Sequence, residues 1–216
     1  MKKQVADLVA QNNLDSLVAL AVRERMVLRY LVSLLYEREG ERRWRAVEAV
    51  GRVAEREADR DEERVRDLLR NLMWALNDES GNMPWSAPEA IGEIVARRPE
   101  LFGGFAANLV YNYLDEPAVT RGVLWAVGRI GRHNPGLVAE ILPAVESLLG
   151  DPDPAIRGYA AWALAENGVK LPGAAARLAS DERVIEIWEN GRLVRMPVRE
   201  VATRLLDTPQ AIGRLG

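Results

Sequence analysis

Residues 115–129 read Asp-Glu-Pro-Ala-Val-Thr-Arg-Gly-Val-Leu-Trp-Ala-Val-Gly-Arg, and residues 153–166 repeat the pattern as Asp-Pro-Ala-Ile-Arg-Gly-Tyr-Ala-Ala-Trp-Ala-Leu-Ala-Glu. The two tryptophans, Trp125 and Trp162, are 37 residues apart by their numbers. A fixed period of this size is typical of solenoids made of stacked helix pairs. The repeated stretch therefore predicts an all-α superhelix.

The same period extends toward the amino end of the chain. Four segments share a run of small residues that begins at Ala49, Ala90, Ala126 and Ala163, at spacings of 41, 36 and 37 residues. Each follows a segment whose apolar residues recur at helical spacing, within residues 23–36, 65–76, 109–114 and 138–149. About three repeats are enough to bury a continuous core. We therefore expect four to five helix pairs in residues 23–168, after short capping helices in residues 1–22.

The segment Asp151–Leu164 resembles the turn and second helix of a HEAT repeat, in the variant found in phycobilisome-lyase-type HEAT-like proteins. The preceding repeat is similar but has Thr120 where the motif has arginine, and the two earlier repeats lack the Asp-Pro turn. The resemblance covers residues 23–168. It implies an armadillo-like superhelix of antiparallel helix pairs that is used mostly for binding proteins, although HEAT motifs occur with unrelated functions.

The period ends after Gly168. Two β-rich runs joined by Asn190 and Gly191 predict a β-hairpin over residues 183–196, because this dipeptide supplies two positive φ angles. Pro197 then begins a last helix. We interpret residues 169–216 as a cap on the end of a single domain, residues 1–216. The alternative is an exposed edge strand that recruits a partner.

Composition excludes several kinds of site. The chain has 216 residues, 48% of them apolar, a net charge of −3 and no cysteine. It therefore has no disulfide, thiolate nucleophile or sulfur-bound zinc, and its charge argues against a strongly basic nucleic-acid-binding domain. No uncharged apolar stretch reaches about 18 residues, the length that suggests a membrane span. We expect a cytoplasmic protein.

Helical geometry predicts which face of each second helix is available. Counted from the aligned alanine, apolar residues fall at positions −2, +1 and +4, whereas bulky and charged residues fall on the opposite side at −5, −1 and +3. In a HEAT array the second helices line the concave surface. The candidate binding residues there are Trp44, Arg52, Trp85, Glu89, Glu93, Arg121, Trp125, Arg129 and Trp162. The alternative is that the indoles are buried between repeats.

Residues 77–89 form the least repeat-like part of the array. Asp78 and Glu79 are candidate functional residues there, because function often lies on loops held by a rigid scaffold. The structural alternative is a capping box, in which Ser86 caps the next helix and Glu89 reaches back to it.

The predicted function is a non-catalytic scaffold that binds a protein or peptide on its concave face. We expect no catalytic residue, metal or cofactor, and no membrane or nucleic-acid partner. His133 is the only histidine, which argues against a catalytic triad. One alternative is a lyase or chaperone for bilin or another tetrapyrrole, which the resemblance suggests. A HEAT-like DNA glycosylase is disfavoured by acidic residues such as Glu48 and Glu166 on the same face.

Overall fold

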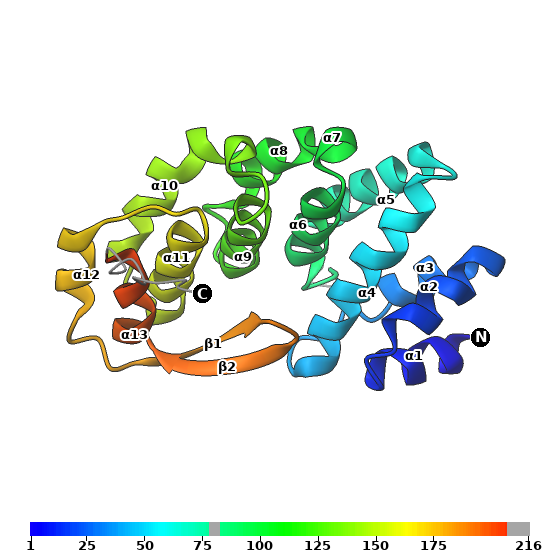
Figure 1. Cartoon of the computed structure of the whole chain (residues 1–216), viewed down its shortest axis with the longest axis horizontal. Helices are drawn as coiled ribbons and strands as arrows, with labels where there is room; N and C mark the ends of the chain where they lie inside the picture. The colour runs from blue at the N-terminus through cyan, green and yellow to red at the C-terminus, as the bar shows by residue number, and fades with distance from the viewer. Residues whose placement is uncertain (78–82, 207–216) are drawn as a thin grey trace, which may run out of the picture.

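The computed structural model describes residues 1–77 and 83–206. They form a curved array of helices that runs from the amino end to the carboxyl end in sequence order (Figure 1). The prediction of an all-α superhelix with a small hairpin is confirmed. None of the helices in these two ranges is both long enough and apolar enough to cross a membrane.

Four helix pairs make up the centre of the array. In each pair an outer helix precedes an inner helix, and the inner helices pack side by side along the molecule. The outer helices are α3 (Met26–Val32), α5 (Glu62–Ala75), α8 (Gly104–Tyr113) and α10 (Leu142–Ser147). The inner helices are α4 (Glu41–Ala58), α6 (Ala87–Arg97), α9 (Thr120–Gly131) and α11 (Pro154–Glu166).

Short elements complete the array. The helices α1 (Lys2–Ala10) and α2 (Leu14–Arg23) pack against the first pair, and Asn13 caps α2 by accepting a hydrogen bond from the Ser16 amide at 3.1 Å. A single turn, α7 (Pro99–Phe102), precedes α8. Three 3₁₀ turns lie at 135–137, 139–141 and 148–150 around α10. The last repeat is followed by α12 (Pro172–Leu178).

The apolar stripe of the inner helices forms the core, as the sequence predicts. Val47, Ile91 and Leu124 are each 0% exposed. Small residues bring neighbouring inner helices together: a Cβ atom added at Gly92 would lie 2.5 Å from the Cβ atom of Ala126. A methyl group does not fit at that distance, so the glycine sets the spacing between α6 and α9.

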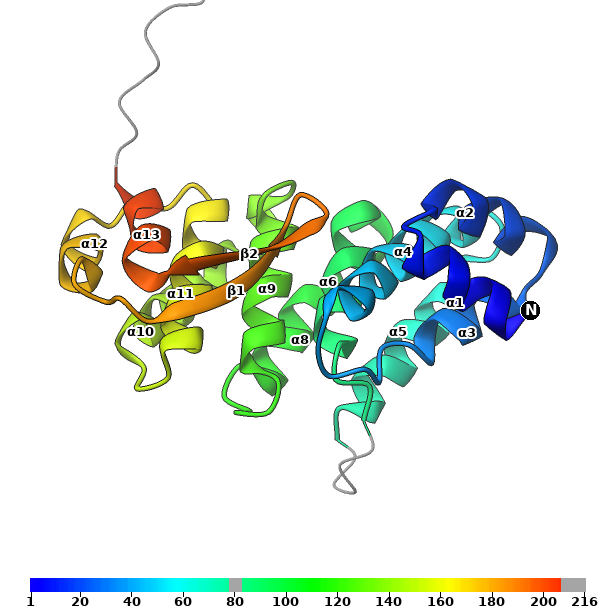
Figure 2. The same cartoon turned by 90° about the horizontal axis from the view of Figure 1, so that it is seen from below.

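The predicted hairpin is present, but it extends further along the array than a cap on the end of the array would. Strands β1 (Val184–Glu189) and β2 (Arg192–Pro197) pair antiparallel, and the turn residues Asn190 and Gly191 have φ angles of 51° and 76°. The following α13 (Val198–Ala202) and the 3₁₀ turn at 203–205 pack on α11 at the end of the array. From there the two strands run back across the inner helices toward α4 (Figures 1 and 2).

Candidate binding groove

The inner helices present one continuous face, and β1 lies in it. The tryptophans of this face come from α4, α9 and α11, and a fourth indole comes from the hairpin. Trp188 stacks on Trp44 with ring centroids 6.0 Å apart and planes at 2°. Trp44 meets Trp125 at 5.1 Å, and Trp125 stacks on Trp162 at 6.3 Å. We call these four residues the indole stack.

The expectation that tryptophans line an open groove is wrong for Trp44, Trp125 and Trp162, whereas Trp85 is half-buried. Trp44, Trp125 and Trp162 are each 3% exposed, and Trp188 is 2% exposed. All four indoles belong to the hydrophobic core, and the hairpin supplies Trp188 to cover the other three. The alternative of burial between repeats holds in part: Trp125 stacks on Trp162 of the next repeat, but Trp44 is covered by Trp188 of the hairpin. A flat ligand stacked on Trp44, as in the tetrapyrrole or DNA-lesion alternatives, would meet Trp188, which already stacks on that ring.

Polar groups of the inner helices bind the backbone of β1. The Trp125 indole Nε1 donates to the carbonyl oxygen of Trp188 at 3.1 Å, and the Tyr159 hydroxyl donates to the carbonyl oxygen of Glu186 at 2.7 Å. Burial raises the pKa of the Tyr159 hydroxyl, so it stays protonated as a donor. The Trp188 Nε1 atom donates to Glu48 Oε1 at 2.9 Å. Side chains of three inner helices, α4, α9 and α11, thus form hydrogen bonds with the hairpin.

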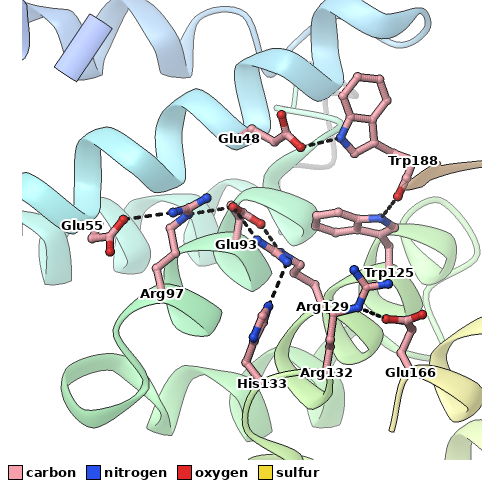
Figure 3. A network of polar contacts seen from close by, with 10 residues as sticks. All are labelled: Glu48, Glu55, Glu93, Arg97, Trp125, Arg129, Arg132, His133, Glu166 and Trp188. Carbon is pink, nitrogen blue, oxygen red and sulfur yellow. Dashed lines mark hydrogen bonds and ion pairs between the residues drawn. The ribbon is translucent and has the colours of Figure 1, made fainter. Parts of the chain in front are cut away.

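Glu93 is the centre of an ionic network beside the indole stack (Figure 3). This carboxylate is 0% exposed, and it accepts hydrogen bonds from Arg97 at 2.7 Å and from Arg129 at 2.5 Å. Arg129 also lies 3.1 Å from the Nε2 atom of His133. Burial, with the positive charge of Arg129, lowers the pKa of His133. Two arginines on one buried carboxylate are the pattern of a structural network, because an unpaired buried charge is costly.

Glu48 lies at the edge of the same network. Burial raises the pKa of its carboxyl group, the hydrogen bond from Trp188 opposes this shift, and the negative charge of Glu93 adds to it. Further along, Arg132 pairs with Glu166. A small cleft of about 170 Å³ separates these side chains from the tip of the hairpin.

A larger cleft lies on the other side of β1. It measures about 860 Å³ and runs along the first turns of α4, α6, α9 and α11. Arg43 donates to the Ser86 hydroxyl at 2.9 Å and to Glu89 at 3.0 Å. The guanidinium group of Arg38 lies 4.1 Å from the centre of the half-buried Trp85 ring. Arg121 is exposed at the start of α9.

The structure divides the predicted binding residues between these two clefts. The larger cleft is lined by Trp44, Trp85, Glu89 and Arg121, and the smaller one by Glu93, Trp125, Arg129 and Trp162. Arg52 lies apart from both, 3.5 Å from Asp15 of α2. Asp78 and Glu79 lie outside the described residues.

The predicted capping box is wrong. Ser86 is the N-cap residue of α6, but its side chain makes no capping hydrogen bond. Its hydroxyl and the Glu89 carboxylate both bind Arg43 of α4, so these residues join two repeats. The local pattern could not reveal this contact, because the arginine lies 43 residues before the serine.

Sequence reasoning missed the residues that the hairpin contributes. Trp188 and Ile185 lie in a segment without helical period, and their partner Tyr159 of the inner helix α11 lies in an apolar run. One signal was available: Trp188 adjoins Ile187 in β1, so two successive large apolar residues point to opposite faces of the strand. A two-stranded hairpin with apolar groups on both faces has to be covered on both.

Comparison with known proteins agrees with the fold. Residues 121–166 match the HEAT-like repeat family, and no curated protein sequence matches the chain. A designed armadillo repeat protein in complex with the peptide (KR)4 is 19% identical, with a TM-score of 0.56 over 94% of this chain and 96% of its own. Computationally designed armadillo repeat proteins for modular peptide recognition are 21% identical, with a TM-score of 0.51 over 95% and 98%. The predicted resemblance to HEAT-like repeat proteins is confirmed, and these likenesses show the fold alone.

Proposed function

We propose that this protein binds a protein or peptide partner on the inner side of its helical array, in the larger cleft beside β1. The observation that carries the proposal is the cleft itself, which measures about 860 Å³ and passes four successive inner helices. Such a trough fits an extended chain segment better than it fits one compact small molecule. The similarity to armadillo repeat proteins described with peptides supports the same kind of partner.

The cleft carries charges of both signs, because it is lined by Arg38, Arg43 and Arg121 and by Glu39, Glu41, Glu89 and Glu186. Carboxylate groups of a partner would bind at the arginines that have no acidic partner in the described chain. Among the described residues, neither Arg38 nor Arg121 forms an ion pair, and both line the cleft. Arg121 lies in the first turn of α9 and Arg38 shortly precedes α4, so both are near a helix N-terminus, where the helix dipole adds positive potential. The half-buried Trp85 ring, with Arg38 over it, offers an apolar surface in the same cleft. We therefore expect a segment that places acidic side chains beside the arginines and an apolar side chain on Trp85.

Site-specific photo-cross-linking tests the site. A photoreactive amino acid at Ala118, an exposed residue of the larger cleft, is compared with the same group at Tyr111, which is 71% exposed on the outer helix α8. The partner should be captured from Ala118 and not from Tyr111. Equal capture at the two positions would reject the cleft as the site.

Affinity for the captured partner tests the chemistry. Arg38→Glu with Arg121→Glu should weaken binding at least tenfold, because the carboxylates of the partner would then meet like charges. Arg177→Glu is the matched control, since Arg177 is exposed, forms no ion pair in the described chain and lies outside the cleft. An unchanged dissociation constant for the double variant, with all three proteins folded, contradicts the proposal.

A further inference from the structure

The inner helices hold β1 by its main chain. The carbonyl groups of Glu186 and Trp188, two residues apart, lie on the edge of β1 that faces away from β2. They accept the hydrogen bonds of Tyr159 and Trp125 at 2.7 and 3.1 Å. Every extended chain presents carbonyl groups at alternate residues along one edge. These two donors can therefore hold an extended segment whatever its side chains are.

The side chains of β1 fill positions shaped for them. A Cβ atom at Gly158 would lie 2.2 Å from the Cδ1 atom of Ile185, so the missing side chain of this glycine makes room for the isoleucine. Ile187 is 0% exposed. Trp188 completes the indole stack and finds an acceptor in Glu48 at 2.9 Å. The groove therefore fits an aliphatic side chain at position 185, any side chain at 186, an aliphatic side chain at 187 and tryptophan at 188.

The second strand has a different role. Arg192 and Arg195 of β2 are exposed, and Leu193 and Val194 are only half-buried. In the described ranges no hydrogen bond joins β2 to an inner helix. One strand of the hairpin is thus bound as a ligand would be, and the other strand only returns the chain to α13.

We propose that β1 is an internal substitute for the partner. A partner segment in extended conformation, with the pattern aliphatic, any residue, aliphatic, tryptophan, takes the place of Val184–Glu189 after the hairpin leaves the groove. This inference rests on the proposed function and names the part of the partner that would be bound. The larger cleft beside β1 would receive the residues that flank this segment.

A variant without the hairpin tests the groove directly. The carbonyl oxygen of Arg183 accepts a hydrogen bond from the Val198 amide at 3.0 Å, so a short glycine linker can replace residues 184–197. The probe is a fluorescent peptide with the sequence of residues 183–189. We expect micromolar binding to this variant, and at least tenfold weaker binding of the same peptide with Trp188→Ala. Lack of binding at 1 mM peptide, in a variant with native circular dichroism, overturns the proposal.

A disulfide lock tests displacement in the full chain. The protein has no cysteine, and a Cβ atom at Gly158 would lie 3.3 Å from the Cγ1 atom of Ile185. The Cγ1 atom marks where the sulfur of a cysteine at 185 would lie, so the double variant Gly158→Cys with Ile185→Cys brings the two side chains within reach of a disulfide. The reduced protein should bind the peptide at least tenfold more tightly than the oxidised protein. Equal affinity in the two redox states rejects displacement.

If the variant without the hairpin does not fold, a third measurement tests whether β1 leaves the groove in the folded protein. The thiol of Ile185→Cys should react with a disulfide reagent in native buffer at least tenfold faster than that of Leu164→Cys, which lies in the core at 1% exposure. Equal reactivity would mean that β1 leaves only when the whole protein unfolds, and would overturn the proposal.

Two further outcomes separate this inference from the proposed function. A partner that cross-links at Ala118 and binds the oxidised and reduced locks equally would support the cleft and reject displacement. Dimers that appear with rising concentration, and that the lock abolishes, would show that β1 leaves the groove but would identify a second copy of this chain as the occupant, and would reject a separate partner segment.

Discussion

The Nε1 atom of Trp188 lies 2.9 Å from the Oε1 atom of Glu48, although 140 residues separate the two in sequence. Trp188 belongs to the hairpin that follows the last repeat, and Glu48 belongs to the inner helix of the first pair. The two ends of the repeat array are therefore joined directly. A solenoid in which each repeat contacts only its neighbours lacks such a connection.

Removing the indole of Trp188 should destabilise the whole array. We expect Trp188→Ala to lower the free energy of unfolding by about 3–5 kcal/mol, because a buried aromatic side chain is lost and three other indoles gain exposure. Urea denaturation measures this change. The control is Trp74→Ala, since Trp74 is 77% exposed on α5, and its effect should be within about 0.5 kcal/mol. Similar losses in the two variants would contradict the buried stack.

The Glu48 carboxylate should matter more as an acceptor than as a charge. Glu48→Ala leaves the buried Trp188 N–H without an acceptor and should cost about 1–3 kcal/mol. Glu48→Gln keeps an acceptor oxygen and removes the repulsion with Glu93. Since burial raises the pKa of Glu48, the neutral amide should be at least as stable as wild type at pH 7. Thermal unfolding that places the glutamine variant as far below wild type as the alanine variant would show that the charge is needed.

Close helix packing should make one glycine irreplaceable. Gly92→Ala should destabilise the protein by about 1–3 kcal/mol, because the new methyl group would lie 2.5 Å from the Cβ atom of Ala126 and 2.6 Å from its Cα atom. Gly104→Ala is the control in helix α8, where a Cβ atom would have no neighbour within 4 Å. That change should stabilise the protein by about 0.4–1 kcal/mol, because alanine has less conformational freedom than glycine in the unfolded chain. Calorimetry of the two variants should therefore give shifts of opposite sign.

Acid should loosen the base of the hairpin. Hydrogen bonds from Arg183 and from Arg157 of α11 hold the pKa of Asp181 at about 2, below its ordinary 3.8. The carboxylate is thus bound more strongly in the folded state, so its stabilising effect is complete above pH 3.8 and is lost as the pH falls toward 2. In Asp181→Asn the stability should vary less over this range. Urea titrations at pH 4.5 and pH 2.5 measure the difference, and equal pH dependence in both proteins would contradict it.

The period of the sequence predicts the array well, because the same physical requirement recurs in every repeat. The alanines that begin each small-residue run and the apolar positions around them have to face the neighbouring helices, so their spacing defines the inner helices. The Asn190-Gly191 turn has an equally local cause. These features depend on residues a few positions apart.

The site could not be predicted to the same extent, because its decisive contacts join distant parts of the chain. The orientation of Trp125 follows from helical geometry, but its burial depends on a strand that begins 59 residues later, at Val184. Arg43 and Ser86 likewise look like unrelated local signals until α4 and α6 are placed side by side. Periodicity predicts the direction in which a side chain points, but it does not predict which distant segment of the chain packs against that side chain.

The reach of the hairpin has a consequence for how this gene can change. Repeat proteins commonly lengthen or shorten by duplicating or losing whole units. Here a six-residue strand has to bring its indole from α11 as far as α4. One additional repeat would move Trp44 beyond the reach of Trp188, and one repeat fewer would leave the end of β1 extending past the first inner helix. The hairpin thus acts as a ruler that fixes the number of repeats between its anchor and its tip.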